Sequence, residues 1–336
     1  MPPQFILSLD FELHWGVFDH TPLDEKGRKY FLTTRALIPE ILKLFRQENI
    51  CCTWATVGML FAENREQIRQ FFPNKKPLYK NPKLNAYGLF EKNEVGKNET
   101  EDPFHFAPSL IRQILDTPGQ ELGSHTFSHY YCLEPEADQE TFREDLAATQ
   151  AIANENFDLY LKSLVLPRNQ FSDDLTETIR QAGFSAVRTN PDIWFWKSAA
   201  TGDEGLTKKF CRLADHYVPL QKTTAFAQNG ATKAHLLEVP ASRFFRPYIR
   251  KFDKCGGQIL KISRIKNEMT AAAAGGKNYH LWWHPHNLAT HPEKNMAALR
   301  QLIRHFQILR DKYGMKSRGM IAPPGASPKY PGEGGS

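Results

Sequence analysis

The chain has 336 residues, of which 41% are hydrophobic and 24% are charged. This composition suffices for a large core and excludes a wholly disordered protein. The formal net charge of +6 suits an anionic partner, but the basic clusters are short and no nucleic-acid-binding motif accompanies them, so no nucleic-acid partner is expected.

Cysteine usage and the N-terminus bear on the compartment. The five cysteines are an odd number and show no zinc-finger or Cys-x-x-Cys spacing, which argues against a disulfide framework. No apolar run approaches the roughly 18 residues that a membrane span needs. The first residues also lack the basic and apolar regions of an export signal. The sequence therefore predicts a cytoplasmic protein without a membrane span.

Short apolar runs alternate with helical patterns along most of the chain. Strands are predicted at 5–9, 52–57, just before Gly123, and at 163–166, 185–188, 236–239 and 279–283. Helices are predicted at about 34–47, 109–115, 138–154, 173–182 and 296–309. This alternation predicts an α/β fold with a parallel sheet.

Two stretches depart from the alternation. Residues 64–108 are rich in Asn, Lys, Glu and Pro, which indicates an insertion or a long surface loop, and a substrate lid is one hypothesis for its role. Residues 323–336 are rich in Pro and Gly and are predicted to be a flexible tail. The segment 193–234 has no clear pattern. We expect residues 1–322 to form a single domain.

Polar residues with catalytic potential follow the predicted strands. In barrels of alternating strands and helices, this end of the sheet is the catalytic face. Four segments converge there, and they carry the following residues: Asp10 and Glu12, His125 and His129, Arg168, and His284.

The first two of these segments suggest a metal site. His125 and His129 are four residues apart, so on a helical turn they would share one side and bind one ion together, although a bare pair of this kind is more often an ordinary hydrogen-bonding pair. Asp10 and Glu12, two residues apart on a strand, project to the same face. Because they end an apolar strand, burial of their charge requires a cation, either a metal ion or an arginine.

In their order, these segments resemble the polysaccharide deacetylase family, the family 4 carbohydrate esterases that include nodulation-type and peptidoglycan deacetylases. The matching segments are 8–12, 53–58, 124–129, 167–168 and 283–284. The resemblance implies a distorted (β/α) barrel of about seven parallel strands. It also implies a hydrolase of linear amide bonds that removes an N-acyl group, expected to be N-acetyl, from an amino sugar in the synthesis of a surface polysaccharide or glycoconjugate.

Carried over by motif position, the resemblance also implies a cofactor and roles for individual residues. The cofactor is one divalent metal ion, zinc in the first place and cobalt, nickel, iron or manganese otherwise. Its implied ligands are Glu12, His125 and His129. Asp10 would be the general base, Arg168 would orient Asp10, and His284 would be the general acid.

The sequence departs from the family pattern in two places. The usual first motif has adjacent aspartates, whereas Phe11 separates Asp10 from Glu12, so which acid is base and which is ligand stays open. The arginine motif lacks its usual proline and aromatic residue, because Asn169 and Gln170 follow Arg168.

Aromatic residues near these motifs are candidates for sugar binding. Trp282 and Trp283 can stack on a sugar or form the barrel wall, and Trp15, with His14, can line the pocket or pack elsewhere. His286 is interpreted as a loop residue, since His284 lies nearest to the predicted strand end.

Two other functions remain open. Relatives of the family include hydrolases of non-sugar amides, such as allantoinase-like enzymes, some of which work without metal. A barrel that binds carbohydrate without turnover belongs to a different class. For the leading function, the substrate is an N-acylated amino sugar. Whether its carrier is a nucleotide, a lipid or a polymer stays open, and an intracellular precursor is favoured over a cell-wall polymer. The oligomeric state cannot be predicted.

Overall fold

The structure, a computed structural model, describes residues 2–200, 205–221, 223–227, 232–233 and 236–321. The strands are Gln4–Phe11 (β1), Cys52–Thr56 (β2), Gln120–Ser124 (β3), Ser163–Leu164 (β4), Ala186–Thr189 (β5), Thr232–Lys233 (β6), Leu236–Pro240 (β7), Arg243–Phe244 (β8), Tyr279–Trp283 (β9) and Lys316–Arg318 (β10). The α-helices are Glu25–Glu48 (α1), Arg65–Gln70 (α2), Gly88–Glu91 (α3), Pro108–Leu115 (α4), Gln139–Phe157 (α5), Thr176–Gln181 (α6), Leu206–Asp215 (α7), Arg250–Phe252 (α8), Gln258–Ala274 (α9) and Pro292–Tyr313 (α10). Short helical turns lie at Leu13–Gly16, Gly58–Phe61, Pro82–Leu84, Pro167–Asn169, Asp173–Leu175, Trp194–Trp196, Asp253–Gly257 and Pro285–Thr290.

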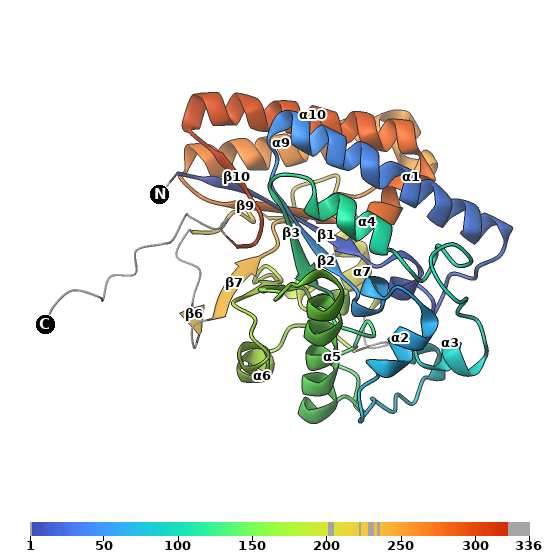
Figure 1. The fold of residues 1–336 in the computed structure, drawn as a ribbon. Coiled ribbons are helices and arrows are strands. Elements are labelled where there is room, and N and C mark those ends of the chain that lie inside the picture. Colours follow the sequence, from blue (N-terminus) through green and yellow to red (C-terminus); the bar gives the residue numbers. More distant parts are fainter. Residues whose placement is uncertain (1, 201–204, 222, 228–231, 234–235, 322–336) are drawn as a thin grey trace, which may run out of the picture.

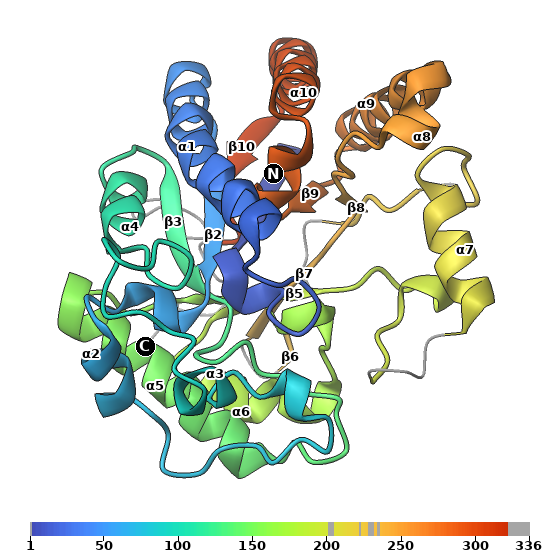
Figure 2. The same cartoon turned by 90° about the vertical axis from the view of Figure 1, so that its right-hand side faces the viewer.

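The strands form one curled sheet in the order β6-β7-β5-β4-β3-β2-β1-β9-β8, with β10 beside the start of β1. Within it only the β6–β7 pair is antiparallel. β7 pairs with β5 and β8 pairs with β9, and only two residues separate β7 from β8. One segment therefore joins the two edges of the parallel sheet. The predicted α/β fold and distorted barrel are confirmed, with more short strands than expected (Figures 1 and 2).

Alternation along β1 explains how the barrel is filled. Phe5, Leu7 and Leu9 belong to the large apolar core that includes residues of the surrounding helices. Ile6 belongs instead to a small second cluster, whose other buried members come from β2, β5 and β7 and from the residues that follow β4 and β10. Because side chains alternate along a strand, Asp10 shares the inner face with Ile6. The sequence thus places a carboxylate inside the barrel, at the end of an otherwise apolar strand.

The helices lie outside the sheet, as Figure 1 shows for α1, α4, α9 and α10. The helix predicted at 34–47 begins earlier, at Glu25, where the Asp24 side chain accepts a hydrogen bond from the Gly27 N–H at 2.8 Å and caps the first turn. This N-terminal half was missed because most of its residues are exposed and polar. Helix α9 was also not predicted, although its buried Ile262, Ile265 and Met269 have helical spacing.

Residues 64–108 are more ordered than the predicted surface loop. They include α2, α3 and the start of α4, and several of their side chains are buried in the large core: Leu89, Phe90, Val95, Phe104 and Phe106. The surface-loop alternative is therefore corrected, because the exposed polar residues hide a sparse apolar pattern, whereas the insertion stays a prediction. The predicted tail at 323–336 lies outside the described residues. In the described part of the chain, no helix combines the length and apolarity that crossing a bilayer requires.

Candidate metal and amide-hydrolysis site

A cleft of about 560 Å³ opens at the carboxyl ends of the strands. Its lining includes most of the polar residues that the sequence singled out: Asp10, Glu12, His125, His129, Arg168, Trp282 and His284. The structure adds His286 and Asn287, and a wall that includes Ser198, Lys209 and Arg212. The segments predicted to converge therefore do so, because the ends of parallel strands meet at one edge.

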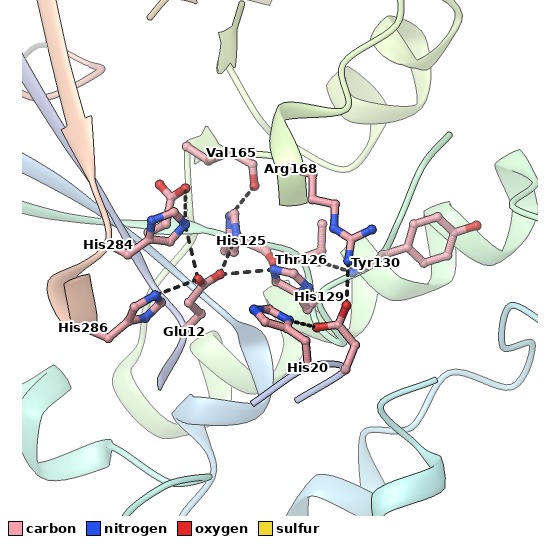
Figure 3. Close-up of polar contacts among 12 residues, drawn as sticks. Glu12, His20, His125, Thr126, His129, Tyr130, Val165, Arg168, His284 and His286 are labelled. Carbon is pink, nitrogen blue, oxygen red and sulfur yellow. Dashed lines mark hydrogen bonds and ion pairs between the residues drawn. The ribbon is translucent and has the colours of Figure 1, made fainter. Parts of the chain in front are cut away.

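Glu12 is the centre of this cleft (Figure 3). Its side chain is 2% exposed, and Oε2 lies 3.2 Å from Nε2 of His125 and 3.1 Å from Nε2 of His129. Despite this proximity, Oε2 is buried without a hydrogen bond. The three ligand atoms lie within 4.8 Å of one another, which fits a divalent cation between them.

The two histidines converge in a different way from the prediction. Residues 125–131 form no helical turn, and Thr126 and His129 adopt left-handed backbone conformations with φ of 63° and 58°. Buried Asp145 holds this loop, since it accepts hydrogen bonds from the N–H groups of Phe127 at 2.6 Å and Ser128 at 3.1 Å. The two histidines lie together beside Glu12, but the helical turn predicted for them is not formed.

The protonation of the histidines suits a metal ligand. Nδ1 of His125 donates to the carbonyl oxygen of Val165 at 2.8 Å, which leaves Nε2 as the ring atom that faces Glu12. Burial lowers the pKa of His129, although the Glu12 carboxylate opposes this shift. Burial also tends to raise the pKa of Glu12, but His284, His125 and His129 lower it well below its usual range. An ionised carboxylate and neutral imidazoles are the forms that bind metal.

Asp10 forms an ion pair with Arg188. The guanidinium donates to Oδ1 at 2.6 Å and to Oδ2 at 2.7 Å, and its Nη1 also donates to Ser8 at 3.0 Å. Both partners are buried, and Arg188 is 0% exposed. Burial raises the pKa of Asp10, but Arg188, with smaller contributions from His125 and His284, brings it below its usual value. Asp10 is therefore ionised at neutral pH.

The predicted role of Arg168 as the residue that orients Asp10 is wrong. Arg168 donates to Asp19 at 2.7 Å and lies over the ring of Tyr131 at 4.4 Å, on the rim of the cleft. The motif position misled because Pro167–Asn169 forms a tight turn in which Arg168 has a φ of 54°. Arg188 was missed, although a charge at the end of the apolar strand predicted at 185–188 was the available signal.

His284 and His286 face Glu12 from the opposite side (Figure 3). Nε2 of His284 lies 3.3 Å from Oε1 of Glu12 and 3.6 Å from Oδ2 of Asp10. Nε2 of His286 lies 3.9 Å from the same Oε1, and its side chain is 5% exposed. The interpretation of His286 as an ordinary loop residue is therefore corrected. Its neighbour Pro285 begins a helical turn that directs the chain back across the cleft.

Of the three predicted sugar-binding tryptophans, only Trp282 lines the cleft. Trp282 is partly buried and covers the guanidinium of Arg188 at 4.3 Å. Trp15 and Trp283 are each 0% exposed. Trp15 donates to the carbonyl oxygen of His105 at 2.9 Å, and Trp283 packs on Phe245 in the core. Substrate binding by Trp15 and Trp283 is excluded by this burial, since strand alternation turns Trp283 away from the cleft.

Similarity to known proteins agrees with this geometry. The family model described as polysaccharide deacetylase matches residues 16–187, whereas no curated protein matches the chain. Among solved structures, a Mycobacterium smegmatis protein assigned to the polysaccharide deacetylases is 15% identical, with a TM-score of 0.54 and coverage of 96% of both chains. A second such protein, from Pseudomonas aeruginosa PAO1, is 12% identical, with a TM-score of 0.52 and coverage of 91% of this chain and 85% of that one.

Puue allantoinase is 13% identical, with a TM-score of 0.52 and coverage of 94% of this chain and 87% of that one. At these sequence identities, the similarity to the solved structures shows a common fold and carries no conclusion about function. The family model covers just over half of the chain, including the histidine loop but neither Asp10 nor His284. The chain belongs to the polysaccharide deacetylase family.

Proposed function

We propose that this protein is a metal-dependent hydrolase that removes an N-acyl group, most simply N-acetyl, from an amino sugar during the synthesis of a surface polysaccharide or glycoconjugate. The observation that carries the proposal is the placement of Asp10 and His284 beside the Glu12–His125–His129 group in one cleft. Membership of the deacetylase family supports hydrolysis of an acyl group.

Glu12, His125 and His129 would hold a divalent ion, with zinc the first candidate because two imidazoles and one carboxylate are ligands that zinc favours. The fit rests on the buried Oε2 of Glu12, which has no hydrogen bond although two imidazole nitrogens lie 3.1 and 3.2 Å away. When bound, such an ion supplies Lewis acidity toward an amide carbonyl and its attacking water.

Asp10 is placed to accept the proton of the attacking water. Arg188 fixes both of its oxygens and keeps it ionised, so it can act as a base without reorienting. The same ion pair holds the Asp10 carboxylate in one orientation toward the cleft. Glu12 takes the ligand position, because Glu12 and not Asp10 faces the histidine loop.

His284 is placed to protonate the departing amine. Its side chain is 23% exposed at the cleft, and Nδ1 lies 3.0 Å from the Asn287 side-chain oxygen, which orients the ring. Nε2 lies 3.6 Å from Asp10 and 3.3 Å from Glu12 and faces the cleft. Protonation matters because an unprotonated amine is a poor leaving group.

The remaining cleft wall suits a glycoside with an anionic carrier. Trp282 offers a flat apolar surface, and Lys209 and Arg212 also line the cleft. A nucleotide or lipid phosphate is the carrier proposed for the sugar, since phosphates pair with such cations. The five cysteines are all free thiols, which supports a reducing compartment, and we place the reaction in the cytoplasm.

The first test combines metal analysis with an activity assay. Wild-type protein supplied with one equivalent of zinc should contain about one ion per chain and release acetate from N-acetylated nucleotide sugars. His125→Ala should lose both the ion and the activity. His305→Ala is the matched control, because His305 contacts Thr270 and Lys266 on helix α9 and lies outside the cleft lining. A wild-type protein that binds no ion after incubation with zinc, cobalt or nickel would contradict the proposal.

A further inference from the structure

Four imidazoles surround the single carboxylate of Glu12, in two pairs. The Nε2 atoms of His125 and His129 lie 3.2 and 3.1 Å from Oε2. On the other side, the Nε2 atoms of His284 and His286 lie 3.3 and 3.9 Å from Oε1. Each oxygen of one carboxylate thus faces its own pair of ring nitrogens (Figure 3).

The two pairs also correspond in the hydrogen bonds that their Nδ1 atoms make on the side away from Glu12. In each pair, one histidine has Nδ1 held by an oxygen: that of His125 by the Val165 carbonyl at 2.8 Å and that of His284 by the Asn287 side chain at 3.0 Å. With Nδ1 held by an oxygen, Nε2 is the ring atom that faces the carboxylate and can bind a cation. A histidine whose Nδ1–H is bound to an oxygen is the usual arrangement of a metal ligand.

The second histidines of the two pairs also correspond. The Nδ1 atoms of His129 and His286 are both buried without a hydrogen bond. His286 is 4% exposed, so its Nε2 is directed toward Glu12 and the cleft instead of bulk solvent. The ligand atoms of Glu12, His284 and His286 lie within 4.8 Å of one another, as do those of the first group.

From this correspondence we propose a second divalent-cation site made by Glu12, His284 and His286, with Glu12 bridging it to the first. Each ion would have two imidazoles and one carboxylate oxygen, which is the three-ligand set of an open zinc site. A carboxylate that bridges two ions is a known element of two-metal centres, where the ions are about 3.5–4 Å apart. This inference rests on the proposed function for the identity of the first site.

Occupation of the second site has a functional consequence. It uses Nε2 of His284, which is the atom proposed to carry the proton for the departing amine. With one ion the chain keeps its proton donor, and with two ions it loses that donor. The second site would therefore make the enzyme sensitive to inhibition by excess divalent metal, with His286 determining the sensitivity.

The experiment is a titration of metal-free full-length protein with Zn²⁺, followed by calorimetry and by elemental analysis after gel filtration. Wild type should bind two ions per chain, the second more weakly. His286→Ala should bind one ion. His291→Ala is the matched control and should still bind two, because the His291 ring packs against Tyr248 outside the cleft lining. Two ions in His286→Ala would place the second ion elsewhere and overturn the proposal.

Wild-type protein loaded with Mn²⁺ provides a test that needs no substitution. Two ions bridged by one carboxylate should give a spin-coupled electron paramagnetic resonance spectrum at two equivalents, whereas two isolated Mn²⁺ signals would overturn the bridge. A single ion in wild type, lost in His129→Ala, would overturn the second site and leave the proposed function standing. Absence of any ion would contradict both.

The activity readout follows from the same titration. Acetate release by wild type should rise to one equivalent of zinc and fall by about tenfold or more at a large excess. In His286→Ala, activity normalised to its own value at one equivalent should not fall. Equal inhibition of both proteins by excess zinc would contradict the role given to His286.

Discussion

Two buried clusters of acids and imidazoles lie close together in this protein and differ in how their nitrogens are used. In the cleft cluster, defined as Asp10, Glu12, His125, His129, His284 and His286, four Nε2 atoms converge on Glu12. In the wall cluster, defined as His14, His105 and Asp102, every ring nitrogen has a hydrogen bond. Asp102 binds Nδ1 of His105 at 2.7 Å, Nε2 of His105 binds Nδ1 of His14 at 2.8 Å, and Nε2 of His14 binds the Thr21 carbonyl oxygen at 2.8 Å.

The difference separates a structural cluster from a site. Hydrogen bonds use all of the donors and acceptors of the wall cluster, so it stabilises the contact between the turn after β1 and the 64–108 segment. The cleft cluster leaves a buried carboxylate oxygen and two Nδ1 atoms without hydrogen bonds. Both clusters consist of histidines and acidic residues. They differ in which of their atoms remain available for a ligand.

The largest expected effect is on activity and distinguishes the two clusters directly. Glu12→Gln keeps the shape of the side chain but removes the charge that holds the ion, so kcat/KM should fall by at least about 10⁴-fold and zinc should be lost. Asp102→Asn in the wall cluster should lower kcat/KM by no more than a few fold and keep the zinc. Steady-state kinetics and elemental analysis measure both. Comparable losses of kcat/KM and zinc in the two variants would show that the two clusters do not differ in function.

The second prediction concerns the charge behind the cleft. Arg188→Met leaves the buried carboxylate of Asp10 without its partner, and the free energy of unfolding should fall by about 3–5 kcal/mol in urea denaturation. Arg168→Met is the matched control, because Arg168 is 34% exposed and pairs with Asp19 at the rim. Its cost should be about 1 kcal/mol or less. A larger loss of unfolding free energy for Arg168→Met than for Arg188→Met would favour Arg168 as the partner of Asp10, as the sequence predicted.

The third prediction uses pH to measure the wall cluster. Burial, with the nearby His105, lowers the pKa of His14 from 6.5 to about 4. The unfolded chain therefore binds the proton more readily between these values, so this histidine adds stability above pH 6.5 that is lost as the pH falls toward 4. The contribution is about 3 kcal/mol.

In metal-free protein, the free energy of unfolding should rise less steeply between pH 4 and 6.5 in His14→Gln than in wild type. The difference in slope should correspond to at most one proton taken up on unfolding. Urea denaturation at several pH values measures this slope. His20→Gln is the control, since the His20 side chain is 62% exposed. An unchanged slope in His14→Gln would mean that the lowered pKa of His14 does not contribute to the pH dependence of the unfolding free energy.

The smallest expected effect is on substrate binding. Trp282→Ala removes the only tryptophan of the predicted three that lines the cleft and should raise KM by about tenfold, with a smaller change in kcat. Trp194→Ala, at an exposed position outside the cleft lining, should leave KM unchanged. A pure loss of kcat in Trp282→Ala would show that Trp282 acts by covering Arg188 instead of by contacting the sugar.

The sequence by itself determined the alternation of strands and helices, the parallel sheet and the cleft at its carboxyl edge. It also determined that Asp10, Glu12, His125, His129 and His284 meet there. These follow from local patterns, because strand alternation sets which face a side chain occupies and strand ends define one edge. The acidic pair at the end of an apolar strand was the strongest single signal, since its burial requires a cation.

Only the tertiary structure decided which partners these residues take. Arg188 and Arg168 each follow or end a strand, and the register of neighbouring strands, which local sequence does not encode, brings Arg188 and not Arg168 to Asp10. The turn at Pro285–Thr290 likewise directs His286 onto Glu12. The burial of Trp15 likewise depends on a distant segment, because its indole N–H donates to the carbonyl oxygen of His105. Partner choice depends on contacts between segments far apart in the chain, and these contacts exist only after the barrel has formed.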